Sequence, residues 1–315
     1  MATLIKTVDL KKYFKVGNGY LHAVDNVNLE IPAGNTLGVV GESGCGKSTL
    51  GRTIIRLLDA TSGSVYFEGQ DISKVKGREF DKIRRQMQII FQDPFSCLNP
   101  RMPVYKLIAE PLEIYRVYKN TADQNKRVLQ LMDTVGLARR FINSYPHEMD
   151  GGRRQRVGVA RALALNPKFI VCDEPVSALD VSIQAQILNL LMDLQDELKL
   201  TYLFITHDLL VVRHISDEIA VMYLGQCIEK SPSNELFKNP LHPYTKALLS
   251  AIPLPDLSQR KKPVILQGEV SSPINPKPGC RFANRCNYRT EACTKADYPL
   301  KEVTPGHFVA CELYK

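Results

Sequence analysis

The stretch HEMDGGRRQRVGVARALALNPKFIVCDEPVSALD, residues 147–180, decides the fold. Its first half is a basic run with the apolar spacing of a helix, and this run opens on a Gly-Gly pair. Its second half contains an apolar strand, FIVCD, that ends at Asp173 and is followed by Glu174. Because α/β sheets bind ligands at the carboxyl ends of their strands, we expect an α/β protein with its chemistry at this edge.

The segments around this stretch repeat the strand and helix signals. Residues 2–32 predict short strands, residues 37–40 an apolar strand, and residues 62–72 a hairpin that turns at Glu68-Gly69. From residue 93 to about 162 strand signals give way to helical periodicity, and strands alternate with helices again afterwards. This alternation predicts a parallel sheet covered on both faces, with a helical insert.

Composition sets broader limits. The 315 residues suffice for one large domain and an appendage, and 44% apolar with 23% charged residues is typical of a soluble globular protein. A net charge of +8 fits phosphate ligands, nucleic acid or an anionic membrane surface without choosing among them. The N-terminus lacks the pattern of a secretory signal, and no window reaches the roughly 18 apolar residues of a membrane span. We expect a cytosolic chain, in which cysteines serve metal binding or burial rather than disulfides.

A glycine-rich loop follows the strand at 37–40. The sequence GESGCGKS matches G-x-x-x-x-G-K-[ST] between a predicted strand and a predicted helix, the context that the motif requires. Glycines let backbone N–H groups curl around a polyphosphate, and the helix N-terminus adds a positive end. We expect Lys47 to reach the β- and γ-phosphates and Ser48 to bind Mg²⁺. The predicted ATP-binding residues of this loop are Gly41, Glu42, Ser43, Gly44, Cys45, Gly46, Lys47, Ser48 and Thr49.

The two carboxylates after FIVCD complete the expected site. Asp173 is predicted to hold the Mg²⁺ shell, and Glu174 to orient or polarise an attacking water. They follow the phosphate loop by about 125 residues and precede the SALD segment, which strengthens the prediction.

These motifs resemble the nucleotide-binding subunits of ABC transporters over nearly the whole chain. The resemblance implies a P-loop ABC ATPase fold, an α/β fold with a RecA-like parallel sheet, an antiparallel β subdomain and an inserted helical subdomain. It also implies roles for Gln92 in IIFQDP, as a ligand of Mg²⁺ and water, and for His207 in FITHD, as a γ-phosphate contact. Adenine would stack on Phe14 or, alternatively, on Tyr13. The residues that resemble the D-loop facing the dimer partner are Ser177, Ala178, Leu179 and Asp180.

The signature segment departs from the family pattern. The family's L-S-G-G-Q faces the ATP of the opposite subunit, but this chain has Asp150, Gly151, Gly152 and Arg153 after Met149. A lost Ser hydrogen bond costs about 0.5–1.5 kcal/mol, whereas a carboxylate about 4 Å from a phosphate oxygen costs roughly 4 kcal/mol at an effective dielectric near 20. Unless Arg153 or Arg154 neutralises Asp150, the composite site built on this segment is weak. We therefore expect a heterodimer whose partner supplies a regular signature.

The tail narrows the resemblance to the ATP-binding subunits of oligopeptide and dipeptide importers, F type. NPLHPYTKALLS (239–250), SSPINP and the cysteines carry this likeness. Four cysteines without paired C-x₂₋₄-C spacing suit a [4Fe–4S] cluster better than zinc, and free thiols in a structural tail are the third alternative. These four are Cys280, Cys286, Cys293 and Cys311.

The predicted organisation is an ABC domain over 1–252, with its helical subdomain at about 93–160, and a small Cys-containing extension over 253–315. The predicted cofactors are ATP, Mg²⁺ and the [4Fe–4S] cluster. Implied partners are a second ATPase subunit, two permeases and an extracellular or periplasmic binding protein, which place the chain peripherally on the cytoplasmic face of the membrane. Nickel or oligosaccharide import is the alternative within the family. A soluble ABC ATPase acting on nucleic acid or ribosomes, and a P-loop kinase or GTPase, are the rival classes, and we expect no nucleic-acid partner.

Overall fold

The computed structural model of the chain describes residues 2–252, 264, 266, 268 and 271–314. The chain forms two compact units, each described here by itself. The first unit holds Met1–Ala2, Pro32–Asn35 and Lys74–Phe204, and the second holds Thr3–Ile31, Thr36–Ser73 and Ile205–Lys315. Both units combine strands with helices, in agreement with the predicted α/β class.

The strands of the first unit lie in the order β6 (Met87–Ile90), β7 (Phe169–Asp173) and β8 (Thr201–Ile205). β6 and β7 run parallel, and every residue of β7 and β8 is buried. Full burial explains why these strands read as continuous apolar runs rather than as alternating ones. Two helices complete this part of the unit, α2 (Gly77–Gln86) and α7 (Val181–Leu198).

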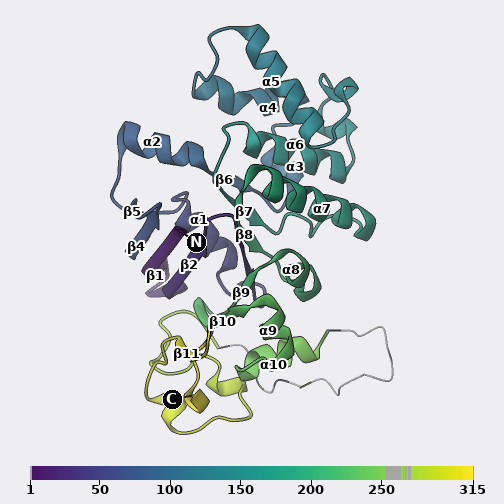
Figure 1. Ribbon diagram of the computed structural model, residues 1–315. Coiled ribbons are helices and arrows are strands. Elements are labelled where there is room, and N and C mark those ends of the chain that lie inside the picture. The colour runs from purple at the N-terminus through teal and green to yellow at the C-terminus, as the bar shows by residue number, and fades with distance from the viewer. Residues whose placement is uncertain (1, 253–263, 265, 267, 269–270, 315) are drawn as a thin grey trace. The chain divides into compact units, whose positions relative to one another are not determined.

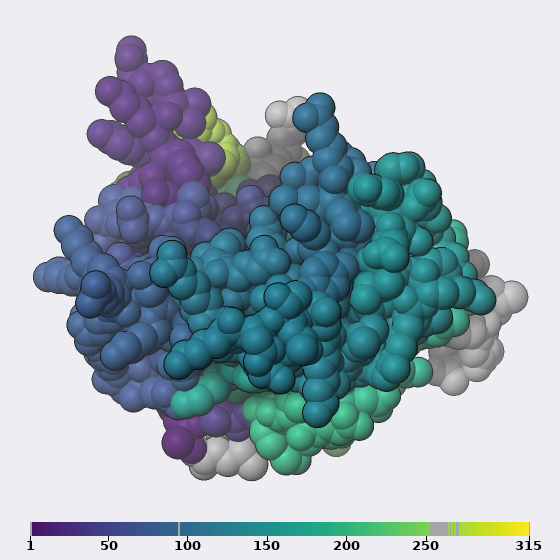
Figure 2. Space-filling model, turned by 90° about the horizontal axis from the view of Figure 1, so that it is seen from above, coloured from purple at the N-terminus to yellow at the C-terminus, as the bar shows by residue number. Residues whose placement is uncertain are grey.

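The helical insert belongs to the first unit, where α3, α4, α5 and α6 contact one another (Figure 1). Asn120 caps α5 by accepting a hydrogen bond from the Asp123 N–H, and Leu131 and Met132 of α5 are buried. Figure 2 looks onto this helical face, drawn in teal. The four helices are α3 (Pro94–Cys97), α4 (Val104–Ile114), α5 (Thr121–Thr134) and α6 (Gly151–Leu163). Among the described residues no helix is both long and apolar enough to cross a bilayer.

An antiparallel sheet opens the second unit, with strand order β2-β1-β4-β5. β4 and β5 turn at Glu68 and Gly69, which have φ angles of 50° and 79°. Two successive left-handed residues are the requirement of a tight hairpin turn, so the predicted hairpin is confirmed. The first two strands are longer than the fragments predicted within 2–32. The strands are β1 (Thr3–Val16), β2 (Gly19–Pro32), β4 (Ser62–Phe67) and β5 (Gln70–Asp71).

A second set of strands in this unit lies in the order β11-β12-β10-β9-β3. β3 and β9 are parallel, whereas β9–β10, β10–β12 and β11–β12 are antiparallel. The sequence predicted a parallel sheet here, but this set of strands is mixed, because β10 returns from β9 through the tight Leu224-Gly225 turn without a crossover helix. The strands are β3 (Thr36–Val40), β9 (Glu218–Tyr223), β10 (Gln226–Pro232), β11 (Lys301–Thr304) and β12 (His307–Val309). The helices are α1 (Lys47–Ile54), α8 (Leu209–Ile215), α9 (Ser233–Lys238) and α10 (Pro243–Ser250).

The C-terminal tail docks on β10 through a buried carboxylate. Glu229 accepts hydrogen bonds from the Leu241 and His242 N–H groups, at 2.7 and 2.9 Å, and lies 2.8 Å from His307 Nε2 of β12. Glu229 and His307 are both fully buried. The tail thus shares a sheet and a core with residues 205–250. The predicted domain boundary near 250–258 falls mainly outside the described residues and stays a prediction.

Candidate nucleotide site

The phosphate loop depends on two glycines. Gly41 has φ 151° and Gly46 φ 103°, conformations that L side chains rarely adopt. A Cβ on Gly41 would lie 2.2 Å from the Met222 carbonyl oxygen, and one on Gly46 would lie 1.9 Å from that of Ala23. Neither carbonyl is at the end of a flexible side chain, so any side chain at these positions would deform the loop.

Lys47 begins α1 and is almost fully buried under the loop. Its Nζ donates to the carbonyl oxygens of Gly41 and Glu42, at 2.8 and 3.0 Å. Cys45 is also buried, and its Sγ fills the space beside Gly41. Because burial raises the pKa of the Cys45 thiol, this cysteine acts as a packing residue rather than as a nucleophile.

Glu42 of the same loop is bound by residues far along the chain. Its backbone N–H donates to the Tyr244 hydroxyl at 2.9 Å, and its two carboxylate oxygens each accept from Arg285 Nη1 at 3.0 Å. Sequence reasoning missed Arg285, which directly precedes Cys286. The signal available was the spacing of Arg281 and Arg285 beside cysteines in CRFANRC.

Two of the predicted catalytic residues meet in the first unit. Asp173 ends β7 and is fully buried, and Glu174 follows it in a left-handed conformation with φ 48°. Gln92 Nε2 donates to Glu174 Oε2 at 2.9 Å. A strained conformation that turns a carboxylate toward a polar partner is common at functional sites. The structure thus brings Gln92 and Glu174 into direct contact, and their predicted roles toward Mg²⁺ and the attacking water stay predictions.

The predicted magnesium ligand Ser48 and the predicted catalytic residue His207 belong to the second unit. Ser48 lies in the first turn of α1, and His207 is exposed after β8. Asp208 next to it caps α8 through hydrogen bonds from the Leu210 and Val211 N–H groups. This cap holds the backbone at the start of α8, and His207 directly precedes the capping residue.

The signature segment begins α6, and Asp150 is its N-cap. Asp150 Oδ1 accepts from the Arg153 N–H at 2.8 Å, and Oδ2 lies 2.9 Å from Arg153 Nη1. The carboxylate is thus paired with the arginine that stands where the family has glutamine. A Cβ on Gly151 would lie 3.0 Å from Leu179, so this glycine lets the signature segment approach the predicted D-loop of the same chain.

Of the two candidate adenine platforms, Tyr13 already has partners. Its ring stacks on His22 with the ring centroids 3.8 Å apart, and its hydroxyl donates to Asp25. The Phe14 ring has Lys12 above it, with Nζ 5.0 Å from the centroid. Successive side chains of a strand point to opposite faces, so one of these residues at most can serve.

The four tail cysteines line one small pocket of about 10 Å³, together with His242 and Phe282. None of these four cysteines forms a disulfide bond in the part of the chain that the structure describes. Burial, followed by the neighbouring cysteines, raises the pKa of Cys280 to about 11, and the pKa values of Cys286 and Cys311 are raised for the same reasons. Within the part of the chain that the structure describes, no group of three or more His, Cys, Asp or Glu residues is arranged to hold a single metal ion.

His242 adds a polar group to the cysteine pocket. Its Nδ1 accepts the Tyr244 N–H at 3.0 Å, so in the neutral ring the proton resides on Nε2. This Nε2 is buried without a hydrogen-bond partner among the described residues. A buried N–H without an acceptor costs about 1–3 kcal/mol, so a bound group that offered an acceptor to Nε2 would be stabilised here.

The phosphate loop, the buried strand ending in Asp173-Glu174 and the Gly-Gly helix together define an ATP-binding cassette. A family model described as ABC transporter matches residues 24–177, and one described as the C-terminal region of oligopeptide/dipeptide transporters matches residues 228–293. A solved dimeric cassette, MJ0796 with bound ADP and phosphate, superposes with a TM-score of 0.67 at 33% identity, covering 73% of this chain and 99% of that one.

Two named relatives can be aligned with almost the full length of the chain. The oligopeptide transport ATP-binding protein AppF of Bacillus subtilis is 49% identical, over 99% of this chain and 98% of its own length. The corresponding protein OppF of Salmonella typhimurium is 50% identical, over 98% and 95%. The chain belongs to the ATP-binding subunits of the oligopeptide ABC transporters and is an ATPase of that family.

Proposed function

We propose that this chain hydrolyses ATP to drive oligopeptide import through a membrane transporter. The observation that carries the proposal is the match of both the cassette and the tail region, 228–293, to this transporter class. Two permease subunits, a second ATPase and an extracellular or periplasmic binding protein would complete the machine, with this chain on the cytoplasmic face of the membrane.

The test of the substrate is ATPase activity of the reconstituted transporter. Peptide-loaded binding protein should stimulate hydrolysis several-fold, and binding protein with nickel or an oligosaccharide should not. If nickel or sugar alone stimulated hydrolysis, that ligand and not peptide would be the substrate. If RNA stimulated hydrolysis without the permeases, the chain would be a soluble ATPase and not a transporter subunit.

For catalysis we propose that Lys47 and Ser48 hold the phosphates and Mg²⁺, with Asp173 and Gln92 in the metal shell. Glu174 polarises the attacking water, His207 contacts the γ-phosphate, and Phe14 stacks on adenine. The Gln92–Glu174 hydrogen bond supports this assignment, because it brings the two side chains that would act on the water into contact with each other. Glu174→Gln should lower hydrolysis by about 10²–10⁴-fold and preserve ATP binding. Unchanged hydrolysis would exclude Glu174 as the base.

We also propose that the working ATPase is a heterodimer in which the site facing Asp150 is the weaker one. Arg153 balances the charge of Asp150, so the pair is neutral overall, like the Ser and Gln of the family pattern. The site facing this segment therefore keeps part of its affinity for ATP. Both side chains are about half exposed in this chain, so the pair adds little to the stability of the chain by itself. If the chain alone formed a stable ATP-bound dimer with two equally active sites, the heterodimer proposal would fail.

For the tail we propose a [4Fe–4S] cluster held by Cys280, Cys286, Cys293 and Cys311. A cluster spreads its thiolate ligands around four irons, so the ligands need not converge on one ion. Four thiols around one pocket and the unpaired Nε2–H of His242 fit such a group, although the pocket must widen to admit it. When bound, the cluster would supply structural or redox-sensing chemistry. Anaerobic purification should give brown protein with about four irons per chain, and colourless zinc-bearing protein would contradict the proposal.

A further inference from the structure

We propose that Arg285 of the tail is a positioning residue for ATP binding, because it neutralises Glu42 and holds the phosphate loop. Nucleotide affinity would then depend on a segment that follows the cassette by many residues. The inference requires nucleotide binding at the phosphate loop and is independent of what the four cysteines hold.

The first argument is electrostatic. Glu42 is the second residue of a loop built to receive a polyphosphate, and a free carboxylate there would oppose the ligand's charge. Arg285 Nη1 lies 3.0 Å from both oxygens of that carboxylate. The exposed fractions of the Arg285 and Glu42 side chains are 12% and 32%, so solvent screens this pair less than a surface pair.

The second argument is mechanical, because Arg285 is fixed at its base. It ends a 3₁₀ turn, Ala283–Arg285, that follows Phe282. The Phe282 ring is buried and packs edge-on against Tyr223 and Tyr244. Since Tyr244 itself accepts the Glu42 N–H, the same aromatic cluster supports both the backbone and the side chain of Glu42.

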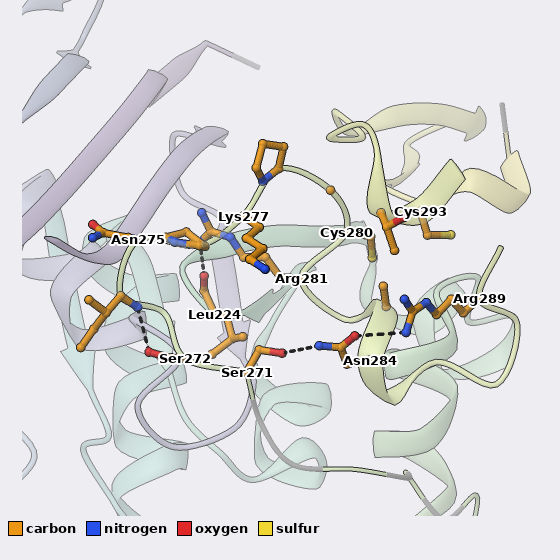
Figure 3. Close-up of a pocket in the computed structure, with 16 residues that line it drawn as sticks. Leu224, Ser271, Ser272, Asn275, Lys277, Cys280, Arg281, Asn284, Arg289 and Cys293 are labelled. Carbon is orange, nitrogen blue, oxygen red and sulfur yellow. Dashed lines mark hydrogen bonds between the residues drawn. The ribbon is translucent and has the colours of Figure 1, made fainter. Parts of the chain in front are cut away.

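A second arginine of the tail makes a parallel contact. Arg281, next to Cys280, donates to the Leu224 carbonyl and pairs with Asp25, which also accepts from the Tyr13 hydroxyl. Figure 3 shows Arg281 with Cys280 and Cys293 in the wall of a cavity of about 510 Å³. The two arginines beside the first two cysteines thus both reach into the region that precedes or forms the nucleotide loop.

The experiment is a double-mutant cycle on ATP affinity, measured by calorimetry with Mg²⁺–ATP in the purified full chain. Arg285→Gln should weaken binding on the order of tenfold in the wild-type background, but less than twofold when Glu42→Gln is also present. Arg285→Lys, which keeps the charge, should restore most of the affinity. The matched control is Arg289→Gln, because Arg289 bonds Asn284 within the tail and should leave affinity unchanged.

A purely structural role predicts a different pattern. Arg285→Gln would then lower the melting temperature without changing the ATP dissociation constant, and the effect would be the same in both backgrounds. That result overturns the proposal. If Arg285→Gln fails to fold, the Arg285→Lys and Glu42→Gln variants still test the proposal. ATP affinity must then depend on the charge at position 285 and on the charge at position 42. Iron content is measured for every variant, so that loss of a metal is not mistaken for loss of the arginine.

Discussion

Two arginine–carboxylate pairs lie beside the two segments proposed to receive ATP phosphates, and they are built in opposite ways. Glu42 meets Arg285 across 243 residues, with the arginine mostly buried, whereas Asp150 meets Arg153 across one helical turn, with both side chains about half exposed. The long-range pair makes the chain's own phosphate loop dependent on the tail. In the local pair, Arg153 neutralises the carboxylate that lies at the start of its own helix. The two regions should therefore respond differently to mutation.

The largest effect is expected from breaking the support of the long-range pair. Glu229→Ala removes the buried partner of His307 and the acceptor of the Leu241 and His242 N–H groups, and should cost about 3–5 kcal/mol of unfolding free energy. ATP affinity should fall as well, because Arg285 belongs to the tail that Glu229 holds. Denaturant unfolding and calorimetry test this, with the exposed Glu197→Ala as control. An unchanged ATP affinity in Glu229→Ala would show that the tail positions Arg285 without the contacts of Glu229.

The local pair can be broken by removing its arginine. Arg153→Gln leaves the Asp150 carboxylate uncompensated, and should weaken ATP-dependent pairing with the partner subunit by about 10- to 100-fold. ATP binding to the isolated chain should not change, in contrast to Arg285→Gln. The double variant Asp150→Ser with Arg153→Gln restores the family's residues and should pair more tightly than the wild type. Analytical ultracentrifugation of the mixed subunits in ATP gives the comparison.

A smaller effect concerns α6 itself. Asp150→Ala removes the N-cap and should cost roughly 1 kcal/mol of unfolding free energy, whereas Asp150→Ser keeps a capping oxygen and should cost little. Equal stabilities of the two variants would show that the Asp150 cap contributes nothing to the fold. Thermal unfolding of the isolated chain is sufficient for this measurement.

The smallest effect is expected from salt. Raising the salt concentration from about 0.05 to 0.5 M shortens the screening length severalfold, and should reduce the contribution of the exposed Asp150–Arg153 pair to nearly zero. The coupling between Glu42 and Arg285 should persist, because the arginine is shielded from solvent. Repeating both mutant cycles at the two salt concentrations provides the test. Equal salt sensitivity of the two couplings would remove the distinction drawn between them.

The sequence predicted what is local. The phosphate loop, the FIVCD strand and the Glu68-Gly69 turn are each specified by contiguous residues whose backbone needs are readable, as the forbidden Cβ positions at Gly41 and Gly46 illustrate. The antiparallel part of the sheet was missed because β10 follows β9 through a two-residue turn, and because the strands at 301–304 and 307–309 are too short to give a periodic signal. The Asp150 carboxylate was recognised as a problem, but its pairing with Arg153 depends on a rotamer that no pattern encodes.

The contact between Glu42 and Arg285 could not be predicted for a different reason. No periodicity relates residues 243 positions apart, and the sequence pattern placed Glu42 in the phosphate loop but indicated no role for Arg285. Only the packing of Phe282 between Tyr223, Tyr244 and His242 brings the arginine to the loop. The convergence of four cysteines was expected from the family resemblance, but the buried Nε2 of His242 beside them required the structure.

The long sequence separation of Glu42 and Arg285 has a consequence for biosynthesis. At about 5–20 residues per second, a ribosome needs roughly 12–50 s to extend the chain from one to the other. During that interval the phosphate loop exists without its arginine, and β10 has an open edge that β12 covers only later. With Arg285 in the proposed positioning role, the nascent cassette would reach its full affinity for nucleotide only after the tail has emerged and docked, so the order of synthesis would delay ATP binding until then.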